Sequence, residues 1–163
     1  MTIAACYPCL EGVVLGADST ATIGQRLHYN FTQKVFEFGE RGSTVGMVIW
    51  GLGMLPTVSH RTLIAEVADE ARKQNVSSLA DVAGLWAARF WHEYTKAFRV
   101  EIERVHELQE RGNERTEKES REYNGLCWSL SCGFCMAGRW GGHRRPRAFE
   151  IIFNPLRKEQ PPP

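Results

Sequence analysis

Two predicted helices in the middle of this chain constrain its fold most, because strand-like segments lie on both sides of them. Residues 58–73 place their apolar side chains on one helical face, and Ser78 with Asp81 forms a capping box that starts a second helix. We expect this second helix to run to roughly Arg111, where Gly112 stops it. Its apolar stripe consists of Leu79, Val82, Trp86, Phe90, Tyr94, Phe98, Ile102, Val105 and Leu108.

The flanking segments are rich in β-branched, aromatic and small apolar residues, which is typical of strands. The predicted strands cover residues 2–6, 13–19, 34–38, 44–50, 126–138 and 147–153. The first two form a hairpin, and Gly141 with Gly142 forms the turn that connects the last two. The sequence therefore predicts an α+β fold, in the order four strands, two helices and two strands.

The predicted domain is single and covers residues 1–153, with a charged insertion near 112–123. Residues 114–122 are almost all charged and of mixed sign, which predicts a solvated helix extension or a mobile loop. Residues 154–163 form a proline-rich tail. Proline lacks the backbone N–H that a helix or sheet needs, so this tail cannot continue either.

Thr2 becomes the first residue if Met1 is removed, and it then carries a hydroxyl and a free amine together. The hydroxyl is too weak an acid to attack an amide by itself. An α-amino group titrates at roughly 7.7–8.0, so it is partly neutral at physiological pH and can act as the base. Thr2 is therefore a candidate nucleophile.

The sequence after Thr2 resembles the proteasome β-type subunits and the related bacterial HslV peptidases, which are N-terminal nucleophile hydrolases. The resemblance rests on Thr2, on the string Gly-Val-Val-Leu-Gly-Ala-Asp-Ser-Thr-Ala-Thr over residues 12–22, and on Lys34. Asp18 lies 16 residues after Thr2 and Lys34 lies 32 residues after it, as in the family.

The resemblance implies catalytic roles for Thr2, Asp18, Lys34 and Gly51. An ammonium on Lys34 would favour the deprotonated Thr2 hydroxyl, and the Asp18 carboxylate would hold that ammonium in place. The backbone N–H of Gly51 would donate to the oxyanion of the tetrahedral intermediate, a contribution of roughly 2.7–4 kcal/mol. Ile49 matches a residue that lines the apolar substrate pocket of the family, although extra residues precede it here.

The fold implied by the resemblance is a four-layer αββα sandwich, of which this chain matches the first half to two-thirds. In the family, further strands and helices supply a serine and an aspartate that support the nucleophile. Because residues 154–163 cannot continue the fold, we expect a sandwich truncated at its C-terminus. Such a sandwich leaves an open sheet edge and part of an apolar face uncovered.

The function implied is that of a threonine-type endopeptidase or amidohydrolase that cleaves peptides or unfolded proteins without a cofactor. The family works in closed rings, so the resemblance implies a homo-oligomeric ring with an unfoldase or activator as a candidate partner. The alternative is a catalytically inactive, proteasome-like interaction subunit or a truncated gene product.

Composition argues against nucleic-acid and membrane partners. The formal charge of +1 suggests no polyanion as principal partner, and the basic cluster at residues 143–147 reads as a solvated turn. No apolar run approaches the roughly 18–20 residues that span a bilayer, and no signal segment is evident. We therefore expect a cytoplasmic protein.

The cysteines offer a competing interpretation. Cys6 with Cys9 and Cys132 with Cys135 have the C-x-x-C spacing of structural zinc sites. However, more than a hundred residues separate the two pairs, and each lies in a strand-like segment where small apolar cysteines pack well. We therefore expect packed thiols and no metal.

Overall fold

The structure is a computed structural model that describes residues 3–23, 27–29, 32–39 and 44–163. Its strands are β1 (Ala4–Pro8), β2 (Val13–Ala17), β3 (Ala21–Ile23), β4 (Leu27–Tyr29), β5 (Val35–Glu37), β6 (Val45–Gly51), β7 (Cys132–Gly138) and β8 (Arg147–Phe153). Its helices are α1 (His60–Lys73), α2 (Leu79–Ala97), α3 (Arg99–Arg111), the 3₁₀ turn η1 (Gly112–Glu114) and α4 (Glu117–Leu130). The chain is thus a mixed α and β protein, as predicted.

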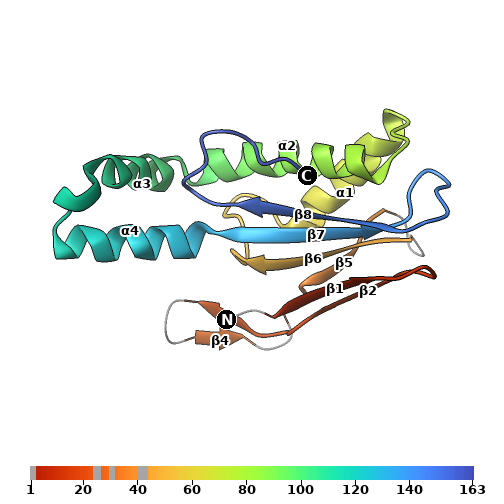
Figure 1. Cartoon of the computed structure of the whole chain (residues 1–163), viewed down its shortest axis with the longest axis horizontal. Helices are drawn as coiled ribbons and strands as arrows, with labels where there is room; N and C mark the ends of the chain where they lie inside the picture. The colour runs from red at the N-terminus through yellow and green to blue at the C-terminus, as the bar shows by residue number, and fades with distance from the viewer. Residues whose placement is uncertain (1–2, 24–26, 30–31, 40–43) are drawn as a thin grey trace.

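Within the described residues, the main elements stack in three layers (Figure 1). The central layer is an antiparallel sheet in the order β5-β6-β7-β8. Helices α1 and α2 cover one face of it, and the β1–β2 hairpin lies against the other. Successive residues of a strand point to opposite faces, so Met47 and Ile49 of β6 meet the helices while Val48 between them meets the hairpin.

Aromatic side chains fill the core between the helices and the sheet. Phe90 of α2 lies with its ring centroid 4.6 Å from those of Phe134 in β7 and Phe153 in β8. Trp86 and Tyr94, one turn to either side of Phe90, are also fully buried. The apolar stripe predicted for the second helix is thus confirmed as packing surface, with only Phe98 of its members partly exposed.

Both helices that follow β6 begin at capping serines, and only the second cap was predicted, since the first helix was expected from about residue 58. The Ser59 hydroxyl accepts a hydrogen bond of 3.0 Å from the Thr62 N–H, and the Ser78 hydroxyl accepts one of 3.2 Å from the Asp81 N–H. Each cap satisfies a backbone donor that the helix itself leaves unpaired.

Smaller residues fill the interface between the sheet and the hairpin. Val48, Cys135 and Ala137 of the sheet are buried there, and Cys6 and Leu15 of the hairpin pack against them. A Cβ on Gly46 would lie 2.7 Å from Cδ1 of Leu15, so glycine makes room for that side chain. The other face of the hairpin is open, because Ile3, Tyr7 and Val14 are 66, 69 and 65 % exposed.

The predicted second helix is divided at Phe98 into α2 and α3, and α4 runs back beside α3 (Figure 1). These two helices form a helical arm, residues 99–130, that projects past the end of the sheet. Of the two alternatives left open for the charged segment, the helical one is confirmed, because residues 117–122 form the start of α4. One sequence expectation is wrong: residues 126–130 end that helix, so the strand begins only at Cys132.

A capping box explains why the charged segment is helical. The Thr116 hydroxyl accepts from the Glu119 N–H, and the Glu119 carboxylate accepts from the Thr116 N–H at 2.9 Å. This reciprocal pair satisfies two donors at the helix start. The charged residues of both signs can face solvent on most sides of the helix, and in α4 only Leu130 is buried.

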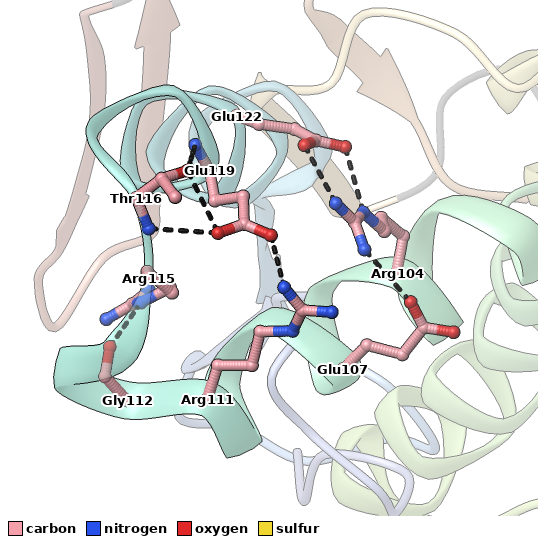
Figure 2. Close-up of polar contacts among 8 residues, drawn as sticks. All are labelled: Arg104, Glu107, Arg111, Gly112, Arg115, Thr116, Glu119 and Glu122. Carbon is pink, nitrogen blue, oxygen red and sulfur yellow. Dashed lines mark hydrogen bonds and ion pairs between the residues drawn. The ribbon is translucent and has the colours of Figure 1, made fainter.

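Charged side chains join the two helices of the arm (Figure 2). Arg104 donates to both carboxylate oxygens of Glu122, at 3.0 and 3.1 Å, and to Glu107 at 3.1 Å. Arg111 also pairs with Glu119. Exposed pairs of this kind contribute only about 0.2–1 kcal/mol each, so their main effect is to fix how α4 lies on α3.

Two further segments complete the described chain. The short β3–β4 pair was not predicted, because the sequence there reads as a polar stretch. The tail, residues 154–163, forms no helix or strand, in agreement with its proline content, although Pro155 and Pro161 are buried. None of the helices among the described residues is both long and apolar enough to cross a bilayer.

Candidate active site

Several strand ends meet at one end of the central sheet and bring predicted site residues together. Asp18 directly follows β2, Lys34 directly precedes β5, and Gly51 ends β6. The Ile49 N–H donates to the Lys34 carbonyl at 2.9 Å, so Lys34 lies beside the C-terminal end of β6. The helical arm joins β7 at this same end, because Gly51 is paired with Cys132.

Lys34 and Asp18 form a close ion pair. The Lys34 ammonium donates to Oδ1 of Asp18 at 3.0 Å and to the carbonyl of Thr20 at 2.5 Å. The Lys34 side chain is only 8 % exposed and that of Asp18 is 26 % exposed. A buried ammonium needs such acceptors. Lys34 is therefore not an exposed charge at a strand edge, and Asp18 holds it as the resemblance implies.

Asp18 also fixes the start of β1. The Ile3 N–H donates to Oδ1 of Asp18 at 2.9 Å, and the Asp18 N–H donates to the Ile3 carbonyl at 3.0 Å. The Ile3 amide and, next, the Lys34 ammonium lower the pKa of the Asp18 carboxyl below its usual value. Asp18 is therefore ionised at neutral pH and links the first residues of β1 to Lys34.

Thr2, the predicted nucleophile, lies outside the residues that the structure describes. Its neighbour in the chain, Ile3, is described and contacts Asp18. Asp18 therefore contacts the residue that follows the candidate nucleophile in the chain.

Gly51 has a backbone conformation that requires glycine. Its φ is +82°, and a Cβ there would lie 2.2 Å from the Ser131 carbonyl oxygen and 2.7 Å from Cα of Cys132. The next amide, Leu52 N–H, donates to that same Ser131 oxygen at 3.1 Å. Close packing against β7 accounts for the glycine, so its oxyanion role rests on the resemblance.

Ile49 points away from the hairpin. Its side chain is 4 % exposed and packs in the helix-side core. The structure thus brings its backbone, and not its side chain, to Lys34. Its role in substrate binding stays a prediction.

The two C-x-x-C pairs do not converge on one point. Cys132 and Cys135 are three residues apart on β7, so Cys132 packs with the helices while Cys135 packs with the hairpin. Cys9 is exposed near the hairpin turn. Among the residues described, no three His, Cys, Asp or Glu side chains are placed to share a metal ion. The four thiols of the two pairs therefore form no single four-ligand cluster in the part of the chain that the structure describes.

Sequence reasoning missed the backbone groups that complete the site. The Thr20 carbonyl accepts from Lys34, and the Ile3 N–H donates to Asp18. Backbone groups carry no residue signature, so only the turn-forming sequence after β2 could have indicated them. The basic cluster at residues 143–147 lies in the exposed β7–β8 loop, as predicted, at the opposite end of β7 from Cys132.

Comparison of the chain with protein-family models, with curated proteins and with solved structures found no significant match.

Proposed function

We propose that this chain is a threonine-type peptidase or amidohydrolase of the N-terminal nucleophile class, in which Thr2 is the nucleophile after Met1 is removed. One observation carries the proposal. The Lys34 ammonium is held at 3.0 Å by Asp18, and Asp18 also accepts from the N–H of Ile3, the residue after Thr2. A cation beside the N-terminal threonine would favour the deprotonated form of its hydroxyl.

The proposed reaction uses these groups in sequence. The Thr2 amine accepts the proton of its own hydroxyl, and the oxygen attacks the carbonyl carbon of a peptide bond. The ammonium of Lys34 stabilises the developing negative charge on that oxygen, while Asp18 keeps the ammonium in position. The amine of the cleaved bond leaves with a proton, and water then hydrolyses the ester on Thr2. An N–H at Gly51 would stabilise the oxyanion in both steps.

The order of the layers supports the proposal that the fold is an αββα sandwich. A helix layer, a four-stranded sheet and a hairpin layer correspond to α, β and β of an αββα sandwich. In such a sandwich a further helix layer covers the outer face of the hairpin, which here exposes Ile3, Tyr7 and Val14. We infer that other chains cover this face in a homo-oligomeric ring that admits unfolded substrates.

Mass spectrometry tests the proposal directly. The purified chain should begin at Thr2, and a peptide epoxyketone should form one adduct, on Thr2. The Thr2→Ala variant should form none, whereas the control Thr57→Ala, at an exposed loop threonine, should react like wild type. Adduct formation on a cysteine with Thr2 untouched would contradict the proposal.

A second candidate function is that of an inactive interaction subunit. The exposed apolar side chains on the hairpin favour it, because contiguous apolar surface marks interaction sites. In this case Met1 should stay in place and no epoxyketone adduct should form, while the chain still binds a partner through the hairpin.

A further inference from the structure

Two thiols from different layers meet in the interface between the hairpin and the sheet. Cys6 lies in the middle of β1, and Cys135 lies in the middle of β7. Cys135 is buried with Val48 and Ala137, and Cys6 packs against this cluster from the hairpin. The Cys6 thiol is thus the thiol of the hairpin that packs toward Cys135.

The other cysteines are placed differently. Cys132 points to the opposite face of the sheet, Cys127 lies on the arm, and Cys9 is exposed beyond β1. Strand alternation causes this separation, since residues three apart in a strand point to opposite faces. The packing thus pairs Cys6 with Cys135, although the C-x-x-C spacing pairs each of them with another residue.

We propose that Cys6 and Cys135 form a modification site, an oxidisable dithiol that closes into a disulfide and ties the β1–β2 hairpin to the central sheet. The oxidant class is a hydroperoxide, with hydrogen peroxide as the simplest member. The site does not depend on the proposed peptidase activity.

The chemistry starts at Cys6, because it is partly exposed whereas Cys135 is buried. The Cys6 thiolate attacks one oxygen of the peroxide, the O–O bond breaks, and hydroxide leaves. Cys6 is now a sulfenic acid. The Cys135 sulfur then attacks the Cys6 sulfur, the S–O bond breaks, and the thiol proton leaves with the hydroxide as water. Overall, two thiols and one peroxide give one disulfide and two waters.

The buried environment of Cys135 sets the rate of closure. Burial, and next the contact with Cys6, raises the pKa of the Cys135 thiol to about 12. Its thiolate is therefore scarce at neutral pH, and the thiolate is the attacking species. We expect disulfide closure, rather than sulfenic acid formation, to limit the reaction and to accelerate as pH rises from 7 to 9.

The disulfide would join segments that are far apart in the sequence and would close a long loop. Cross-links of long loops stabilise the folded state by restricting the unfolded chain. We therefore expect the oxidised chain to unfold at a higher urea concentration than the reduced chain, and dithiothreitol should reverse that shift.

Peroxide treatment of the reduced full-length chain, followed by thiol alkylation and mass spectrometry, tests the site. We expect a mass loss of about 2 Da and protection of two thiols from alkylation. After trypsin digestion, residues 1–26 hold both Cys6 and Cys9, and residues 122–139 hold Cys127, Cys132 and Cys135. The masses of the linked peptides therefore do not identify the bonded cysteines, and variants must assign the bond. Cys6→Ser should abolish the cross-link between these peptides, whereas Cys9→Ser and Cys127→Ser should retain it.

Cys135→Ala is the second variant, since alanine fits the buried site without adding a polar group. In this variant the oxidation of Cys6 should stop at the sulfenic acid, which the reagent dimedone captures. A cross-link that persists in Cys6→Ser or disappears in Cys9→Ser would overturn the assignment. Stepwise addition of oxygen to wild-type Cys6 without any cross-link would overturn the proposed disulfide itself.

Discussion

At the scale of single residues, the ion pair of Lys34 with Asp18 is the part of the candidate site that the structure defines best. The resemblance to the N-terminal nucleophile hydrolases implied the pair, and the two side chains do lie 3.0 Å apart. The burial of Lys34 could not be predicted, because a lysine that opens a strand normally keeps its charge in water. Backbone acceptors make the burial tolerable, in particular the Thr20 carbonyl.

Replacement of Lys34 by methionine should abolish reaction at Thr2. Lys34→Met keeps an apolar stem of similar length but removes the cation that favours the deprotonated hydroxyl. We expect epoxyketone labelling to slow by roughly 100-fold or more. The control Lys73→Met, at an exposed position in the last turn of α1, should label at the wild-type rate. Equal labelling of Lys34→Met and wild type would reject the role of Lys34.

His60 should make the stability of the protein depend on pH. It is 5 % exposed and packs between the rings of Phe90 and Phe134, and burial lowers its pKa from 6.5 to about 4. Below pH 6.5 the unfolded chain therefore binds more protons at this residue than the folded chain. The free energy of unfolding should fall as pH drops from 6.5 to 4, by about 3 kcal/mol.

Urea unfolding at pH 4.5, 5.5 and 7 measures this effect. His60→Phe removes the titrating group from the aromatic core, so its free energy of unfolding should fall less on acidification. His92→Phe changes an exposed histidine of α2 and should keep the wild-type pH dependence. The same slope in His60→Phe and wild type would exclude His60 as the cause.

At the scale of elements, long periodic segments were predicted well, whereas the short apolar run at residues 126–130 was assigned to the wrong element. The stripe of α1, α2 and α3 repeats over many turns, which leaves little ambiguity. Residues 126–130 are a short apolar run that fits either a strand or a buried helix. The deciding signal lies ten residues upstream, where Thr116 and Glu119 start a helix that continues through the run.

Loss of that cap should loosen α4 selectively. Thr116→Ala removes the hydroxyl that accepts from the Glu119 N–H, and an N-cap residue contributes about 1 kcal/mol. Because Leu130 is the one buried residue of α4, little else opposes local opening. Hydrogen exchange of the α4 amides should accelerate by roughly 5-fold, since 1.4 kcal/mol corresponds to a factor of ten.

The exchange of the α1 amides is the internal control, and Thr57→Ala is the matched variant. In Thr116→Ala the α1 amides should exchange at the wild-type rate. In Thr57→Ala the amides of both α1 and α4 should exchange at the wild-type rate. Uniform acceleration across α1 and α4 in Thr116→Ala would instead indicate global destabilisation and would contradict a local role for the cap.

At the scale of the whole molecule, the three layers bury the two faces of the central sheet unequally. The helix side holds the aromatic core, whereas the hairpin side uses small residues and leaves its own outer face to solvent. The sequence predicted helices between two groups of strands and an uncovered apolar face, but it missed the β3–β4 pair and α4 as a separate helix. It could not predict the direction of the arm, because that depends on contacts between charged residues far from the core, such as Arg104 with Glu122.

The outer face of the hairpin should drive self-association. Ile3, Tyr7 and Val14 are each about two-thirds exposed, and alternation places them on one side of the β1–β2 pair. We expect size-exclusion chromatography with light scattering to show a mass that rises with concentration, and a hydrophobic-surface dye to bind. The double variant Tyr7→Lys/Val14→Lys should shift the chain to monomer and reduce dye fluorescence. Val100→Lys changes an equally exposed valine on the arm and should leave both readings unchanged. A monodisperse wild-type monomer that binds no dye would show that this face needs no partner, and would count against the ring in the proposed function.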